Sequence, residues 1–188
     1  MMADLTAGLR AGRRMMMKTG LFGAIALALI ATSHGTLAQT PIPPSPKDFV
    51  MATTQSEEYE IMSAQIADVE AKDSRVRSFA QEMVRDHTRL NENVRHAAMT
   101  AGLPAPNRGM SSDQAMLLSS LQSLRGAEFD RAYVRQQVLA HEQGLAVLKS
   151  FSTEGTEPNL RKSAQSVLPM IRDHLKKAEQ LRSDIEKP

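Results

Sequence analysis

The stretch that decides the fold is residues 73–102, which read DSRVRSFAQEMVRDHTRLNENVRHAAMTAG. Its apolar side chains recur at spacings of three and four, which places them on one stripe of an α-helix. Asp73 offers an N-cap at one end, and Gly102 followed by Pro104 stops the helix at the other. The stripe consists of Val76, Phe79, Ala80, Met83, His87, Leu90, Val94 and Ala97. This stretch therefore predicts one long helix with a single buried face.

Similar start and stop signals recur along the rest of the chain. They predict further helices over residues 46–72, 112–124, 127–153 and 158–185. Pro169 lies inside the last of these and predicts a kink there. No segment alternates apolar and polar residues with period two, so an all-α body is expected. Four helices of roughly 25 residues, each about 37 Å long, have the proportions of an up-and-down four-helix bundle. The short helix is then an extra one between the second and third long helices.

The N-terminal residues have the order of an export signal. Basic residues come first, the apolar run Leu21–Ala31 follows, and the small residues Thr36 and Ala38 form a cleavage site. Residues 1–38 are therefore predicted to be a cleaved signal peptide, residues 39–46 a proline-rich tether and residues 47–188 the helical bundle. The run is too short for a permanent membrane anchor, so the periplasm is the expected location. Arg13 and Arg14 also fit a twin-arginine signal, although the general secretory route is the expected one.

Composition excludes several classes of protein. The chain has no Cys, which rules out disulfides and Cys-ligated zinc. It has 23 Lys and Arg against 21 Asp and Glu. Four of the basic residues, namely Arg10, Arg13, Arg14 and Lys18, lie in the predicted signal, so the remainder has no basic excess. A near-neutral body poor in aromatic residues indicates that nucleic acid is not a partner.

A five-residue motif occurs twice. Residues 83–87 read MVRDH and residues 170–174 read MIRDH, at equivalent points of two predicted helix pairs. This placement is typical of a duplicated helical hairpin, whose two copies face each other across an antiparallel bundle. His87 lies on the apolar stripe of its helix, and His141 and His174 lie on or at the border of theirs. His96 lies about 180° from His87 and is expected to be solvated.

Three histidines on apolar faces allow three interpretations, which are plain core packing, a buried polar network or ligand, and a transition-metal site. The di-iron pattern Glu-x-x-His is absent, because Val84, Val138 and Ile171 occupy the position three residues before each histidine. Met83 and Met170 lie one turn before His87 and His174, and such Met-x-x-x-His pairs offer the softer ligands that Cu(I) prefers. A metal site requires imidazole nitrogens about 4 Å apart or less.

Three motifs together resemble a known family. They are residues 79–87 (FAQEMVRDH), 124–134 (LRGAEFDRAYV) and 168–174 (LPMIRDH), and the chain is similar over about residues 49–181 to the exported bacterial family named domain of unknown function 4142. The resemblance implies a ferritin-like four-helix bundle, often described as an outer membrane protein, without an established activity. It also implies one histidine per helix at His87, His141 and His174, and a first-helix glutamate at Glu60.

The first helix has two candidate inner faces. The bulkiest stripe is Tyr59, Met62, Ile66 and Val69, and Glu60 lies about 140° from its centre. A second face, made of Phe49, Ala52, Ser56, Glu60, Ser63 and Ala67, is small enough for close helix approach. Glu60 is a metal ligand only if the second face is the inner one, and it is otherwise solvated beside Glu57 and Glu58.

Two functions follow from these patterns. The first is an exported bundle that binds a metal ion or small ligand through His87, His141 and His174, with Glu60 as a further candidate. The second is an inert structural or envelope-stress protein that acts through its surface. An enzyme is the third choice, because no nucleophile with a paired base and no phosphate-binding loop occurs. The sequence indicates neither the metal nor an envelope partner nor an oligomeric state.

Overall fold

The computed structural model describes residues 45–187, and this part of the chain is all-helical. The helices are α1 (Pro46–Glu70), α2 (Ser74–Thr100), α3 (Ser112–Gln122), α4 (Gly126–Glu154) and α5 (Pro158–Glu186). The all-α prediction is confirmed. The predicted signal peptide and nearly all of the tether lie outside the described residues. Within residues 45–187, no helix is both long and apolar enough to cross a membrane.

The helix ends follow from local capping. The side chain of Ser45 accepts a hydrogen bond from the backbone N–H of Asp48, and Asp73 caps α2 in the same manner through Arg75. Ser111 and Gln114 form the reciprocal capping box that their spacing predicts. Gly126 adopts φ 62°, a left-handed conformation that favours glycine, and α4 begins there. Side chains and glycine at these positions therefore set the helix boundaries.

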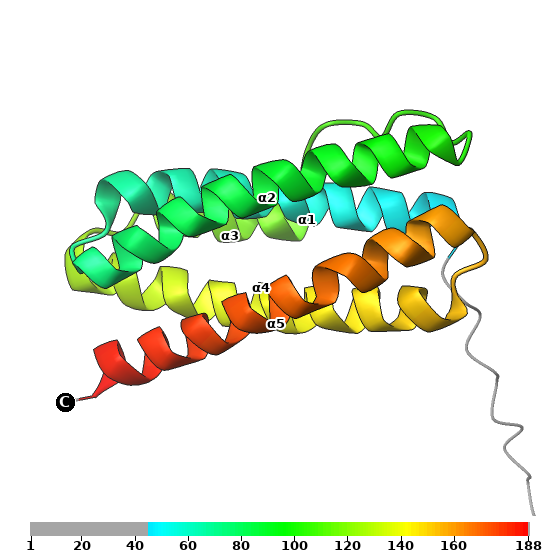
Figure 1. Ribbon diagram of the computed structural model, residues 1–188. Coiled ribbons are helices and arrows are strands. Elements are labelled where there is room, and N and C mark those ends of the chain that lie inside the picture. The colour runs from blue at the N-terminus through cyan, green and yellow to red at the C-terminus, as the bar shows by residue number, and fades with distance from the viewer. Residues whose placement is uncertain (1–44, 188) are drawn as a thin grey trace, which may run out of the picture. The chain divides into compact units, whose positions relative to one another are not determined.

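The four long helices pack side by side, with α1 on α2, α4 on α5, α2 on α5 and α1 on α4 (Figure 1). One core cluster joins the start of α1 and the end of α2 to the end of α4 and the start of α5. The other joins the end of α1 and the starts of α2 and α4 to the later part of α5. Both clusters require α2 and α4 to run in the same direction.

The predicted up-and-down order is therefore wrong at one connection. In that order each helix would run opposite to the one before it, whereas α4 runs parallel to α2. The reason is the length of residues 101–125, which include α3 and return along the bundle before α4 begins (Figure 1). A short loop would have forced α4 to run antiparallel to α2.

The small face of α1 is the inner one. Phe49, Glu60 and Ala67 are buried, whereas Met62 and Val69 of the bulky stripe are 37% and 77% exposed. The division is not complete, since Tyr59 of the bulky stripe is buried and Ala52 of the small face is exposed. Small side chains allow close approach between helices, and this outweighs the size of the other stripe. The alternative of a solvated Glu60 is therefore wrong, and α1 directs a carboxylate into the core.

Candidate metal centre

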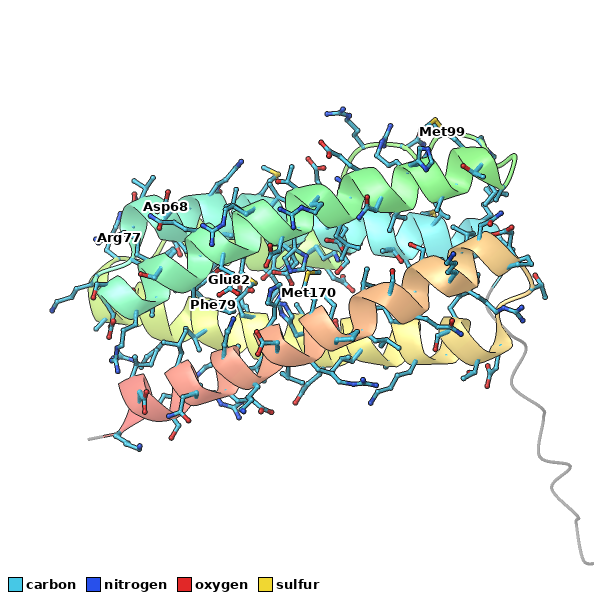
Figure 2. All side chains as sticks on the ribbon, in the orientation of Figure 1. Asp68, Arg77, Phe79, Glu82, Met99 and Met170 are labelled. Carbon is cyan, nitrogen blue, oxygen red and sulfur yellow. The ribbon has the colours of Figure 1, made fainter. Side chains whose placement is uncertain are left out.

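Three histidines from three helices meet in the core. His87 of α2, His141 of α4 and His174 of α5 are each at most 2% exposed. The ring centroids are 5.4 Å apart for His87 and His141, 5.3 Å for His87 and His174, and 5.5 Å for His141 and His174. In Figure 2, nitrogen-bearing side chains gather near the labelled Met170, about halfway along the bundle. The repeated motif therefore faces its copy across the α2–α5 contact, as the sequence predicts.

One nitrogen of each imidazole is held by a hydrogen bond. His87 Nδ1 lies 2.6 Å from Glu57 Oε2, and His174 Nε2 lies 3.1 Å from Asp86 Oδ2. His141 Nδ1 donates to the backbone carbonyl of Gln137, 2.8 Å away. A carbonyl only accepts, so in neutral His141 the lone pair is on Nε2. Glu57 and Asp86 favour a proton on the ring nitrogen that faces them. In neutral His87 the lone pair is then on Nε2, and in neutral His174 it is on Nδ1.

The second nitrogen of each imidazole is buried and has no hydrogen-bond partner among the described residues. These atoms are His87 Nε2, His141 Nε2 and His174 Nδ1. One nitrogen from each ring lies within 4.8 Å of those of the other two. Three nitrogens bound to one ion at about 2.1 Å in tetrahedral geometry are about 3.4 Å apart, a separation that lies within this range.

Glu57 is a site residue that sequence reasoning missed. It is 4% exposed and contacts His87, although the sequence suggests a solvated residue. The available signal is its spacing, because Glu57 lies three residues before Glu60 and therefore shares its face of the helix. Once α1 presents its small face to the core, both carboxylates enter together.

Glu60 lies beside the histidine cluster. Its Oε1 is 3.8 Å from His141 Nδ1, and its Oε2 is buried without a hydrogen-bond partner in residues 45–187. Four further buried side-chain oxygens also have none there, on Thr53, Asn91, Tyr133 and Gln137. Unpaired buried polar atoms are costly, and their concentration in one core sets this region apart from ordinary packing.

The histidines differ in how readily they take a proton. Burial opposes protonation of His87, but the adjacent carboxylate of Glu57, helped by Glu60, raises its pKa to about 8. Burial raises the pKa of Glu57, so this pair readily retains a proton. Burial lowers the pKa of His141, and burial together with the two neighbouring imidazoles lowers the pKa of His174 to about 4. His141 and His174 are therefore neutral near pH 7 and available as ligands.

A second group of ligand-type residues lies on the outer side of His174. Glu82, Asp86 and His174 offer atoms within 4.8 Å of one another. Lys177 already occupies this position, since its Nζ lies 2.6 Å from Glu82 Oε1 and 2.7 Å from Asp173 Oδ2. The ammonium neutralises the outer carboxylates, which makes this group less suited to a cation than the inner three nitrogens.

The other candidate residues from the sequence differ in their burial. His96 is exposed, as expected for a residue on the opposite side of α2 from His87. Met83 is fully buried, and Met170 is partly buried against the core. Both methionines are thus inside the bundle, where packing alone accounts for them.

The comparisons with known proteins concern the fold and the family. No curated protein matches the chain. Similar solved structures include CopM in its Cu(II)-bound form, at 19% identity and a TM-score of 0.65, covering 76% of this chain and 99% of that one. CopM in its Cu(I)-bound form has 18% identity and a TM-score of 0.65, covering 77% and 99%. A DUF305 fragment from Deinococcus radiodurans has 16% identity and a TM-score of 0.65, also covering 77% and 99%.

Identities this low establish a shared helical fold. The family is established separately, since the model of a family described as domain of unknown function, DUF4142, matches residues 31–181. This match includes the three motifs at residues 79–87, 124–134 and 168–174, so the predicted resemblance is confirmed. The chain therefore belongs to the DUF4142 family.

Proposed function

We propose that this protein binds a transition-metal ion in its core through His87 Nε2, His141 Nε2 and His174 Nδ1. The observation that carries the proposal is the pairing of one held and one free nitrogen in every ring. In metal sites the outer nitrogen of a ligating histidine donates to a carboxylate or carbonyl, which fixes the tautomer and leaves the inner lone pair for the ion. All three rings fit this arrangement.

Plain packing accounts less well for the same atoms. A buried donor or acceptor without a partner costs about 1–3 kcal/mol, and here three imidazole nitrogens without one share a small region. An apolar residue of similar size would avoid that cost at each position. A bound cation supplies a partner for all three nitrogens at once.

Glu60 is the fourth ligand in this proposal, and its side chain would have to turn toward the ion, because it approaches His141 from the Nδ1 side and lies outside the group of three mutually close imidazoles. Its partnerless Oε2 lies in the same core, and a carboxylate beside three neutral imidazoles offsets part of a cation's charge. Glu57 and Asp86 add negative charge through the rings that they hold. The chemistry that a bound ion would supply is Lewis acidity or, for copper, one-electron transfer.

Copper is the metal that we propose. Nitrogen ligands bind Cu(II) most tightly among the divalent first-row metals. The similar fold of CopM, solved in Cu(I)-bound and Cu(II)-bound forms, supports this choice. The long crossover before α4 also supports a ferritin-like bundle, a fold in which metal sites are built between facing helices.

The proposed setting is the periplasm. Residues 1–38 would be removed as a signal peptide after export by the general secretory route, and residues 39–46 would leave a proline-rich tether on the bundle. A metal-binding bundle there needs no Cys ligand, which suits the composition of this chain. In the competing view, an inert structural or envelope-stress protein, the core would bind no ligand.

Copper titration of the mature chain tests the function. We expect one Cu ion per chain, and we expect His87→Ala, His141→Ala and His174→Ala each to weaken binding at least a hundredfold. His96→Ala is the matched control, because it removes an exposed histidine of α2. Copper should also raise the thermal midpoint of the parent and of the control, but not of the three core variants.

A negative result would be equally clear. If Cu(I), Cu(II), Zn(II), Mn(II) and Fe(II) all leave the thermal midpoint of the parent unchanged, the core is not a metal site. The inert bundle would then be the better account of this protein.

A further inference from the structure

A cavity connects the surface to the inner carboxylates. It lies between α1 and α4, has a volume of about 160 Å³, and is bordered by Gln114 and Leu117 of α3. Glu57, Glu60, His87 and His141 line it. It therefore reaches two of the three histidines from the side of α1.

Small residues form part of the wall of this cavity. Ala52 and Ser56 of α1 and Ala140 and Gly144 of α4 all line it. A Cβ added at Gly144 would meet no atom within 4 Å, which means that glycine is not required there by close packing. Glycine inside a helix is unfavourable compared with alanine, so its presence at an open position suggests a use for the space.

The charges of the cavity favour a cation. None of the described residues that line it is Lys or Arg, and Glu57 and Glu60 are its acidic groups. Glu60 is 2% exposed, and its Oε2 has no hydrogen-bond partner in the described chain. A carboxylate oxygen in that state is an acceptor for a passing cation as well as for a resident one.

An approach between α2 and α5 is less favourable for a cation than the cavity between α1 and α4. Between α2 and α5, an ion heading for His174 would meet Glu82 and Asp86, but also the ammonium of Lys177. Lys177 is paired with both Glu82 and Asp173, so these ion pairs would have to open before a cation could pass. Figure 2 shows the labelled Glu82 on this α2 side of the bundle.

We propose that the cavity between α1 and α4 is the route by which a metal cation reaches the three imidazoles. This inference rests on the proposed function, and it adds a path and a charge selectivity to the site. Cations would pass Gly144 and be drawn inward by Glu57 and Glu60, whereas anions would be repelled.

Narrowing the cavity tests the route without touching a ligand. We expect Gly144→Leu to slow the association of Cu(II) with the apo chain at least tenfold and to slow its release by chelator equally. The equilibrium affinity should stay within about threefold of the parent, because a narrower path changes both rates and leaves their ratio unaltered. Gly144→Ala should give a smaller slowing in the same direction. Stopped-flow absorbance of the copper–imidazole complex measures the rates.

Ala146→Leu is the matched control, since it adds the same side chain at an exposed position of α4 that does not line the cavity. Its rates should equal those of the parent.

An association rate of Gly144→Leu within twofold of the parent's rate would overturn the route. Slower association accompanied by an equally large loss of equilibrium affinity would also overturn it. A parent that binds no Cu(II) would overturn the proposed function itself, which separates the two failures. Faster association in Lys177→Ala, with no effect of Gly144→Leu, would place the path between α2 and α5 instead.

Discussion

At the scale of single residues, Glu57 would control when His87 of the proposed site is able to accept a metal ion. A protonated imidazole does not ligate, and the Glu57 carboxylate helps to raise the pKa of His87 to about 8. Metal affinity of the parent should therefore fall as pH drops through about 8, well above the ordinary histidine value of about 6.5. This direction follows because protons and metal compete for the same nitrogen.

Glu57→Gln removes the charge and keeps the shape of the side chain. Its affinity for copper should begin to fall at a lower pH than that of the parent, because His87 then holds its proton less tightly. At pH 9, where neither protein is protonated at His87, the variant should bind about 10–100-fold more weakly, since a weaker acceptor orients the ring less well. Competition titrations between pH 5.5 and 9 measure both effects, with Glu58→Gln as the control. Identical pH profiles for parent and Glu57→Gln would contradict this role.

Among the residues of the candidate site, the histidines are predictable from the sequence and the glutamates are not. The three histidines are predictable because each sits on or beside an apolar stripe, and helical periodicity directs such residues inward. Glu57 and Glu60 are not assigned by that rule, because the first helix has two competing faces. Only the packing of α1 against its neighbours decides between them, and that information is spread over several helices.

At the scale of helices, a buried carboxylate holds the turn between α1 and α2. Asp130 of α4 accepts hydrogen bonds from the backbone N–H groups of Lys72, at 3.0 Å, and Asp73, at 2.8 Å. Asp130→Ala would leave both donors without this acceptor. We expect a loss of about 2–3 kcal/mol in the free energy of unfolding, and a smaller loss for Asp130→Asn, which keeps one oxygen. Urea unfolding measures the change, and Asp113→Ala, at an exposed position of α3, should cost about 0.5 kcal/mol. Equal effects at positions 113 and 130 would show that the turn is held by other contacts.

The stripe of α2 makes a second prediction at this scale. Phe79 is buried, and its ring centroid lies 6.4 Å from that of Tyr133 on α4. Phe79→Ala should reduce the free energy of unfolding by about 3–5 kcal/mol, because it removes apolar contacts and leaves a cavity between the helices. Ser78→Ala, one residue away on the exposed side, should change it by less than about 0.5 kcal/mol. Thermal or urea unfolding of the two variants compares the faces, and a loss under about 0.5 kcal/mol for Phe79→Ala would contradict the assignment of this stripe as the core face.

Helix boundaries were predictable at this scale, whereas helix direction was not. Caps such as Ser111 with Gln114 act within a few residues, so the sequence carries them locally. The direction of α4 depends on the path of residues 101–125, and no periodic pattern encodes the path of a connection. The length of that segment allows a return along the bundle but does not require one.

At the scale of the whole molecule, the proposed metal site depends on the finished fold. The proposed ligands come from α1, α2, α4 and α5, so no single helix or hairpin supplies them all. A set of ligands brought together only by folding binds its ion only after folding. The time and place at which the chain folds therefore decide where it meets its metal, and this connects the site to the predicted export signal.

The final prediction concerns that signal. The order of basic residues, apolar run and small-residue pair predicts a mature chain that begins at or very near Gln39. Intact mass of the periplasmic protein should show this N-terminus, and Ala38→Phe should leave the signal attached, because a large side chain does not fit a site that accepts small residues.

Replacing Arg13 and Arg14 by Lys should leave general secretory export unchanged, whereas a twin-arginine signal would fail. A chain exported unfolded would acquire its ion only after it reaches the periplasm, so the Lys variant should be recovered there with the same copper content as the parent. Periplasmic protein that still contains residues 21–31 would contradict cleavage, and loss of export by the Lys variant would assign the twin-arginine route.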